Sequence, residues 1–249
     1  MRILTPYEKN FLTKNNFDLL SPALQTATPV EYLVGRAQFR GLNFFVDNST
    51  LIPRLETEQL VDLALENIFK NYSPNQKIII ADICTGSGCI GVSLALELIK
   101  KNQDFHLYFS DISKTALAVA QKNFNYFLPD HSHLATFLLS DLFSQFPKNV
   151  SLDLVISNPP YIPTKRIKTL DNSVKNYEPL IALDGGDDGL FLINKIIANL
   201  PKIQNNKVNA LIELDENHTI SQIKKSEGLN PSLIKDSFGK NRFLSLLSL

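Results

Sequence analysis

From Lys77 onward, short apolar runs alternate with segments of helical spacing, and this alternation limits the fold more than any other feature of the chain. The runs are typical of buried strands, and the apolar residues of the segments between them recur every three or four positions. Predicted strands cover residues 77–84, 106–111, 135–141, 152–157 and 207–214, and predicted helices cover 86–100, 113–123 and 189–200. This order predicts an α/β fold with a doubly wound, mostly parallel sheet and right-handed crossovers.

The two ends of the chain depart from this alternation. A helix is expected after Asn217, and residues 233–249 are expected to form an antiparallel hairpin that turns at Gly239. Near the start, a helical pattern covers residues 7–15, a hairpin pattern with a turn-like Gly41 covers 39–52, and helical spacing covers 57–70. We therefore expect three parts: a short N-terminal helical segment (1–28), a hairpin and helix that lead into the core (29–74), and a core domain (75–249).

Composition excludes several classes of protein. Lys and Arg together number 25, as do Asp and Glu, so the formal net charge is zero and no global positive field attracts nucleic acid or a membrane surface. The two cysteines, Cys84 and Cys89, are too few for a disulfide framework and have no His or Cys pattern for a metal. No run approaches the roughly 20 apolar residues of a membrane span, and the N-terminus lacks a signal-peptide pattern. We expect a cytoplasmic protein without a metal.

A loop of small residues follows the first strand of the alternation. It reads Cys84-Thr85-Gly86-Ser87-Gly88, and such residues let the backbone approach a ligand and leave N–H groups free for an anion. Asp82, just before the loop, could bind an ammonium group directly or through loop atoms. Asp111 ends the next strand and is placed to hold ribose hydroxyls. The loop therefore predicts a nucleoside-containing cofactor at the carboxyl ends of the strands.

More than one cofactor fits this loop. The string from Gly86 to Gly91 also matches the dinucleotide fingerprint, so a nicotinamide cofactor is an alternative. The acid before the loop, and the position of the loop well inside the chain, favour S-adenosylmethionine. Without any cofactor, the loop would be a tight strand-to-helix turn, and Asp111 would be a carboxylate at a helix N-terminus.

The tetrad Asn158-Pro159-Pro160-Tyr161 follows the fourth predicted strand and is the most specific motif of the chain. An amide or aryl amine nitrogen is a poor nucleophile because its lone pair is delocalised. Two acceptors, the Asn158 side-chain oxygen and the Pro159 carbonyl, could take both N–H hydrogens and leave the lone pair facing a methyl donor. The Tyr161 ring can pack against a flat substrate group. The tetrad thus predicts N-methyl transfer, and its alternative is a rigid turn at the end of a strand.

These residues and their flanking segments resemble the HemK-type protein-(glutamine-N5) methyltransferases, which modify class I peptide chain release factors. The resemblance runs from about Pro29 to the C-terminus. Besides the loop and the tetrad, it rests on Pro29-Val-Glu-Tyr32-Leu-Val-Gly35, Phe39-Arg-Gly41, Pro53-Arg54-Leu-Glu56-Thr57-Glu58, Tyr177-Glu178-Pro179, residues 182–190 and Phe238-Gly239-Lys-Asn-Arg242-Phe243. It implies a class I S-adenosylmethionine methyltransferase (Rossmann-like) sheet and methylation of the glutamine in a Gly-Gly-Gln loop.

The resemblance also implies roles for individual residues. Residues 84–88 would line the methionine part of the cofactor, and Asp111 would bind its ribose. Leu142, after Asp141, would lie beside adenine, with core packing as its alternative. Residues 158–161 would hold the glutamine side chain, with Asn158 also near the cofactor. The segment with Arg54, Glu56 and Thr57 would line the substrate pocket, with a helix entry as its alternative. Cys84 stands where the family usually has glycine.

Three other functions remain open on the sequence. An Asn-Pro-Pro-Tyr tetrad also occurs in adenine-N6 nucleic-acid methyltransferases, in which it would hold a base flipped out of its stack. Zero net charge and the lack of an appended basic domain argue against a nucleic-acid substrate. A ribosomal-protein glutamine is a second possible target, and a catalytically silent binding protein is the third possibility.

Overall fold

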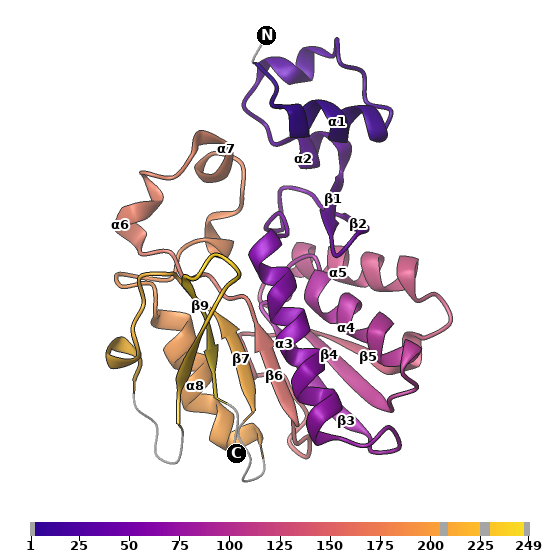
Figure 1. Ribbon diagram of the computed structural model, residues 1–249, viewed down its shortest axis with the longest axis vertical. Coiled ribbons are helices and arrows are strands. Elements are labelled where there is room, and N and C mark those ends of the chain that lie inside the picture. The colour runs from indigo at the N-terminus through magenta and orange to yellow at the C-terminus, as the bar shows by residue number, and fades with distance from the viewer. Residues whose placement is uncertain (1–2, 205–208, 225–229, 247–249) are drawn as a thin grey trace.

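The computed structural model describes residues 3–204, 209–224 and 230–246, and its centre is a twisted sheet (Figure 1). The strands of this sheet are β3 (Ile78–Ile83), β4 (Phe105–Asp111), β5 (Ala135–Leu139), β6 (Leu154–Ser157), β7 (Ala210–Glu213), β8 (Ser232–Lys235) and β9 (Asn241–Ser245). Their order is β5-β4-β3-β6-β7-β9-β8, with β3 to β7 parallel and β9 antiparallel to both neighbours. The predicted doubly wound sheet with an antiparallel C-terminal pair is confirmed.

Two layers of helix cover the sheet. The long helices are α3 (Leu55–Asn71), α4 (Cys89–Lys100), α5 (Lys114–Phe127) and α8 (Phe191–Ile203). Successive side chains of a strand point to opposite faces. Ile78 and Ile80 accordingly pack in one apolar cluster with α3, α4 and α5, whereas Ala81 and Ile83 pack in a second cluster with α8. The apolar run of β3 is therefore buried on both faces, as in other parallel sheets.

The N-terminal part has a small core of its own. Helices α1 (Pro6–Lys14) and α2 (Val30–Val34) and a 3-10 turn at Pro22–Gln25 pack through Phe11, Leu12, Leu24 and Val30. Figure 1 shows them at one end of the molecule, joined to the sheet through a hairpin of β1 (Arg36–Phe39) and β2 (Leu42–Phe45). The Asn123 side chain of α5 binds both the N–H and the C=O of Phe45, which ties this hairpin to the core. The division of the chain at residues 28 and 74 stays a prediction.

Three expectations about local structure need correction. The hairpin predicted at 39–52 begins earlier, at Arg36, and residues 46–54 form no strand, because their backbone follows a turn after Asp47. In place of the helix expected after Asn217, the described residues contain only a 3-10 turn at Ile220–Gln222. Before this turn, the Asp215 carboxylate accepts the Asn217 N–H. Part of the strand predicted at 207–214, residues 207 and 208, and the end of the predicted hairpin, residues 247–249, lie outside the described residues.

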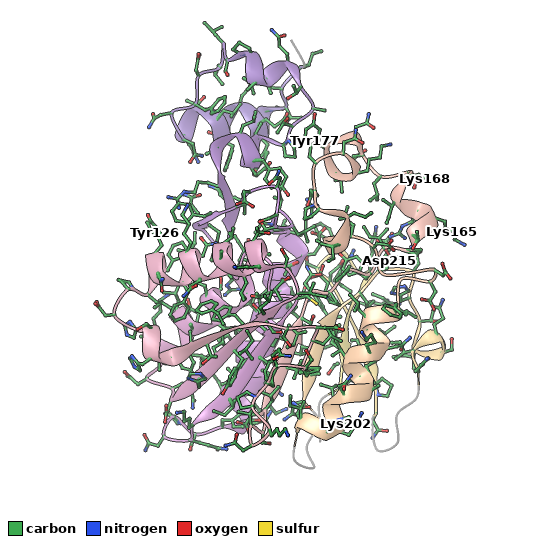
Figure 2. The ribbon with its side chains drawn as sticks, turned by 180° about the vertical axis from the view of Figure 1, so that it is seen from behind. Tyr126, Lys165, Lys168, Tyr177, Lys202 and Asp215 are labelled. Atoms are coloured by element: carbon green, nitrogen blue, oxygen red, sulfur yellow. The ribbon has the colours of Figure 1, made fainter. Side chains whose placement is uncertain are left out.

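The segment between β6 and α8 carries short helices that sequence patterns did not predict. They are α6 (Thr164–Ile167), α7 (Asn172–Lys175) and a 3-10 turn at Leu180–Ala182. A further 3-10 turn, Ser132–Leu134, precedes β5. Figure 2 shows Tyr177 of this segment close to the N-terminal helices and Lys168 and Lys165 progressively farther from them, while Lys202 lies at the opposite end. No helix in the described ranges is both long and apolar enough to cross a membrane.

Gly91 allows α4 to lie close to the sheet, and we expect Gly91→Ala to destabilise the protein. An added Cβ would lie 2.7 Å from Leu107 Cδ2 and closer still to the Phe109 ring. Overpacking of this kind costs about 1–3 kcal/mol. Urea unfolding followed by circular dichroism measures the loss.

Ser93→Ala, on the same helix, is the matched control. Ser93 Oγ is buried and has no hydrogen-bond partner among the described residues, so its removal should leave the free energy of unfolding unchanged or raise it. Equal stability of Gly91→Ala and wild type would contradict the proposed close packing of α4.

Candidate active site

A cavity of about 720 Å³ opens where β3, β4, β5 and β6 end. The carboxyl ends of parallel strands meet at one edge of the sheet, and ligands of doubly wound folds bind there. Of the residues singled out in the sequence, the cavity wall contains Arg54, Thr57, Cys84, Thr85, Gly86, Ser87, Asp111, Asp141, Leu142, Asn158 and Pro160. Five others, Glu56, Asp82, Gly88, Pro159 and Tyr161, lie outside this wall.

The loop after β3 turns through left-handed backbone conformations. Cys84, Gly86 and Gly88 have φ of 58°, 54° and 77°. An added Cβ at Gly88 would lie 3.0 Å from the Cβ of Ala120, so the glycine also lets the loop pack against α5. Burial raises the pKa of the Cys84 thiol, and the carboxylates of Asp111 and Asp82 raise it further. The thiol is therefore neutral and is a wall group rather than a nucleophile.

Several amides of this loop are already bonded within the protein. The Gly86 N–H donates to Asp111 Oδ2 at 2.9 Å, and the Gly88 N–H donates to the Thr85 carbonyl at 2.8 Å. The expectation of free amides does not hold for these two positions. The bond from Gly86 instead helps to fix Asp111. This carboxylate also accepts the Ser113 N–H at 2.8 Å, so two backbone donors hold it in the cavity wall. Burial raises the pKa of Asp111, against the effect of these backbone donors.

Asp82 lies behind the loop and is fully buried. Its Oδ2 accepts the Thr85 hydroxyl at 2.7 Å and the Gly91 N–H at 3.1 Å. Burial raises the pKa of Asp82 to about 7, while these two hydrogen bonds lower it. Of the two arrangements expected for this residue, the geometry corresponds to an action through loop atoms, since Asp82 joins the start of the loop to the first turn of α4.

Asp141 and Leu142 form the wall beyond β5. Asp141 pairs with Lys195 Nζ of α8 at 3.2 Å, and both side chains are partly exposed. Leu142 has φ of 52°, and its carbonyl accepts the hydroxyls of Ser110 and Ser140 at 2.8 and 2.9 Å. Its side chain packs in the core and also lines the cavity. Core packing and a cofactor contact are therefore compatible in one side chain.

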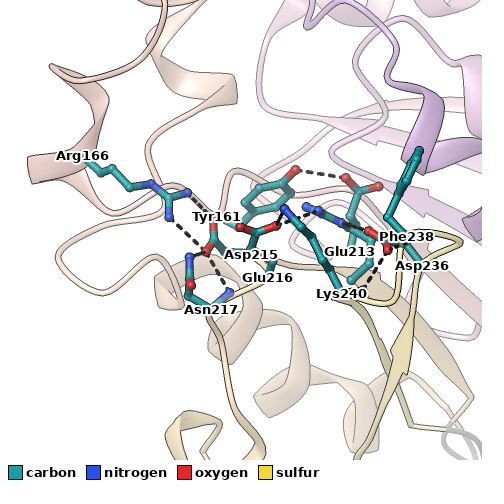
Figure 3. A network of polar contacts seen from close by, with 10 residues as sticks. Tyr161, Arg166, Glu213, Asp215, Glu216, Asn217, Asp236, Phe238 and Lys240 are labelled. Carbon is teal, nitrogen blue, oxygen red and sulfur yellow. Dashed lines mark hydrogen bonds and ion pairs between the residues drawn. The ribbon is translucent and has the colours of Figure 1, made fainter.

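The tetrad after β6 is joined to two distant segments by hydrogen bonds. Asn158 Nδ2 donates to Thr57 Oγ1 at 3.0 Å, and the Thr57 hydroxyl donates to Glu213 Oε2 at 2.7 Å. The Tyr161 hydroxyl donates to the other oxygen, Glu213 Oε1, at 3.0 Å (Figure 3). Burial raises the pKa of Glu213 to about 7, whereas the bonds from Thr57 and Tyr161 and the charge of Arg242 lower it. Each oxygen of this carboxylate thus holds one donor.

Two acceptor oxygens of the tetrad are left without a hydrogen-bond donor. Neither Asn158 Oδ1 nor the Pro159 carbonyl accepts a hydrogen bond from any residue in the described ranges. Tyr161 is turned away from the cavity by its bond to Glu213, so packing of its ring against a substrate stays a prediction. The Asn158 side chain is the part of the tetrad that brings an open acceptor to the cavity wall.

Two glycines, Gly185 and Gly189, pack closely against the backbone of Tyr161 in the tetrad. An added Cβ at Gly185 would lie 2.7 Å from Tyr161 Cα, and one at Gly189 would overlap the Tyr161 carbonyl. Ile162 pairs with the same segment, since its N–H donates to the Leu183 carbonyl at 3.0 Å. The glycine-rich segment 182–190 therefore supports the tetrad from its far side.

Arg54 connects the entry of α3 to the segment before α8. Its Nη2 lies 2.5 Å from Glu178 Oε1, and Glu178 Oε2 accepts the Ile52 N–H at 3.2 Å. The Glu178 side chain is 1% exposed, whereas that of Arg54 is 34% exposed, so water is excluded from the carboxylate and reaches the guanidinium. Arg54 lines the cavity, whereas Glu56 does not.

Sequence reasoning assigned no role to Glu178 and Glu213, although both lay in segments of interest. One signal was available for Glu213. It ends the apolar run of β7, at the same sheet edge as Asn158, and a charged residue there must find buried partners. No group of three or more His, Cys, Asp or Glu side chains in the described part of the chain could hold a metal ion.

Comparison with known sequences gives clear relatives. A family profile described as Methyltransferase small domain matches residues 57–175. The release factor glutamine methyltransferase of Bacillus subtilis is 35% identical over 224 residues, which cover 88% of this chain and 75% of the relative. That of Leptospira interrogans is 37% identical over 220 residues, covering 88% and 74%. That of Bacillus cereus is 39% identical over 187 residues, covering 75% of this chain and 63% of the relative, so the chain spans less than two thirds of that protein.

Solved structures show the same fold at much lower identity. The hMettl16 catalytic domain, in complex with a MAT2A 3'UTR hairpin, matches with a TM-score of 0.60 at 14% identity, covering 83% of this chain and 76% of that chain. The ribosomal protein L11 methylase from Lactobacillus delbrueckii matches with a TM-score of 0.52 at 14% identity, covering 82% and 84%. The predicted class I methyltransferase (Rossmann-like) fold is thus confirmed. By its sequence relatives, the chain belongs to the family of release factor glutamine methyltransferases.

Proposed function

We propose that the protein transfers the methyl group of S-adenosylmethionine to the side-chain amide nitrogen of the glutamine in the Gly-Gly-Gln loop of class I peptide chain release factors. The observation that carries this proposal is the open Asn158 Oδ1 acceptor in the wall of a cavity that also contains the loop after β3 and Asp111. The names of the relatives supply the class of protein substrate. We expect the protein to act in the cytoplasm, where translation takes place.

The residues of the cavity fit S-adenosylmethionine. Its volume of about 720 Å³ is in the range of pockets for cofactor-sized ligands. The carboxylate of Asp111 would hold the ribose hydroxyls, residues 84–87 would line the methionine part, and Leu142 with Asp141 would lie beside the adenine. When bound, the cofactor supplies an electrophilic methyl group on a sulfonium and leaves as a neutral thioether.

The tetrad would orient the glutamine amide for attack. Asn158 Oδ1 and the Pro159 carbonyl would accept its two N–H hydrogens, which places the nitrogen lone pair toward the methyl carbon. As the nitrogen forms its bond to carbon, positive charge develops on it, and the same two oxygens stabilise this charge. One N–H proton then leaves to water, and the product is a neutral N-methyl amide. No strong base is needed at the nitrogen.

A protein substrate is favoured over nucleic acid. The chain has a formal net charge of zero, whereas proteins that hold DNA or RNA present a basic surface to the phosphates. A ribosomal-protein glutamine would present the same amide to the tetrad. Purified release factors, ribosomal proteins and RNA offered in parallel separate these substrates.

Asn158→Ala should abolish most methyl transfer without loss of cofactor binding. Removal of one acceptor for the developing charge costs roughly 10²- to 10³-fold in rate. Transfer of labelled methyl to a release factor measures the rate, and titration with S-adenosylhomocysteine measures binding. A release factor with the loop glutamine replaced by alanine is the control for the site of labelling. Undiminished transfer by the variant, or labelling of the control substrate, would contradict the assigned role.

Asp111→Asn should weaken cofactor binding by roughly tenfold or more, because a carboxylate accepts stronger hydrogen bonds from hydroxyls than an amide does. Calorimetric titration with S-adenosylhomocysteine measures this change. Asp62→Asn, on the exposed face of α3, is the matched control and should bind like wild type. Titration of the wild type with NAD should give no binding, and binding of NAD alone would favour a dinucleotide oxidoreductase instead.

A further inference from the structure

The side-chain amide of Asn158 could present either its oxygen or its NH2 group to the cavity, and its neighbours decide between the two. The amide is next to Thr57 Oγ1, which in turn lies 2.7 Å from Glu213 Oε2. Thr57 and Glu213 are 2% and 1% exposed, so water does not compete for these bonds. A hydroxyl is the link in the middle, and it can either donate or accept toward Asn158.

Glu213 removes this ambiguity. An ionised carboxylate has no hydrogen to donate, so the Thr57 hydroxyl must donate to it. Thr57 then has only lone pairs left for Asn158, and only the NH2 group of the amide can bind them. The amide oxygen is thereby turned to the cavity. Tyr161 donates to the second carboxylate oxygen. Burial raises the pKa of Glu213 to about 7, against these two hydrogen bonds and the charge of Arg242, so the carboxylate is ionised at pH 8.5.

We infer that Glu213 is a positioning residue which, through Thr57, holds Asn158 with its oxygen toward the cavity and so makes the site selective for a carboxamide over a carboxylate. This inference rests on the proposed function and adds the origin of its selectivity. A glutamine brings two N–H donors, one for the open Asn158 oxygen and one for the Pro159 carbonyl. A glutamate of the same shape brings only acceptors, and two facing acceptors repel each other.

The two hydrogen bonds that link Glu213 through Thr57 to Asn158, here called the relay, have a second consequence for variants. Without the Glu213 carboxylate, the Thr57 hydroxyl is free to donate to Asn158 Oδ1, and the amide would turn to meet it. The NH2 group would then face the cavity, where it suits a carboxylate. The relay therefore predicts a change of preference, which general damage to the site would not produce.

Binding of two release factors tests the inference, one natural and one with its loop glutamine replaced by glutamate. Their dissociation constants are measured at pH 8.5 in the presence of S-adenosylhomocysteine, which permits binding without transfer. Wild type should bind the glutamine form roughly tenfold or more tightly, because the glutamate form leaves the Asn158 oxygen in the cavity wall without a donor. Glu213→Met should lower this ratio to about one or below it, since methionine keeps the side-chain length without an acceptor.

Thr57 offers an independent pair of variants that does not remove a buried charge. Thr57→Val, which has the same shape without a hydroxyl, should lose the preference as Glu213→Met does. Thr57→Ser restores the hydroxyl and should recover most of the preference. Glu97→Gln, a matched change at a partly exposed glutamate of α4 that pairs with Lys100, should leave the ratio unaltered.

The outcomes separate the inference from the proposed function. Absence of methyl transfer by the wild type to any release factor overturns the proposed function, and the inference with it. The inference alone is wrong if wild type transfers methyl groups while folded Glu213→Met or Thr57→Val keeps the wild-type ratio of dissociation constants within about twofold. A twofold change is smaller than the loss of one hydrogen bond usually produces. If Glu213→Met does not fold, the comparison of Thr57→Val with Thr57→Ser decides.

Discussion

The parallel pairing of β3 with β4 on one side and β6 on the other is the constraint on which the site depends. Asp82 is paired with Phe109 and with Ile156, so the three strands end nearly level. The loop after β3, Asp111 at the end of β4 and the tetrad after β6 therefore meet at one edge. Antiparallel pairing in either place would have sent one of these elements to the opposite end of the sheet.

Three buried carboxylates hold this edge together. Asp82 bonds the loop to α4, Glu213 bonds the tetrad to α3, and Glu178 bonds the entry of α3 to the segment before α8. Taking a carboxylate out of water is costly unless donors replace the water. Each of these three has two donors, from different segments for Asp82 and Glu213 and from the entry of α3 for Glu178. The cost of burial is thus offset by bonds that also set the shape of the cavity.

Two residues in the cavity wall have a strained backbone. Cys84 and Leu142 both adopt positive φ, which costs a residue with a side chain about 1–2 kcal/mol relative to glycine. The left-handed backbone of Cys84 would suit glycine, the residue that the family resemblance implies at this position. Leu142 is held in this conformation by the two serine hydroxyls that bind its carbonyl. Both strained residues lie in the wall of the cavity, where a fixed backbone shapes the surface offered to a ligand.

Local patterns were enough to predict the sheet, its long helices and the two motifs at its edge. Apolar runs, helical spacing and the signals of Gly86 and Gly88 are properties of neighbouring residues, and they indicate structure before any long-range contact forms. The same patterns failed after Asn217, where the described residues form a 3-10 turn, and at the hairpin, whose first strand starts three residues earlier than its apolar pattern.

Only the tertiary structure decided which side chains support the site and which face it. Thr57 and Glu213 are 156 residues apart in the chain, and Asn158 and Thr57 are 101 apart, so no local pattern relates them. The sequence is equally compatible with Asp82 as a direct cofactor contact and with Asp82 as a residue that holds the loop. Its place behind the loop follows from the packing of α4 on the sheet. By itself the sequence determined which chemical groups are available and at which sheet edge they lie. The fold determined their partners, because a hydrogen bond depends on distance in space and not on distance along the chain.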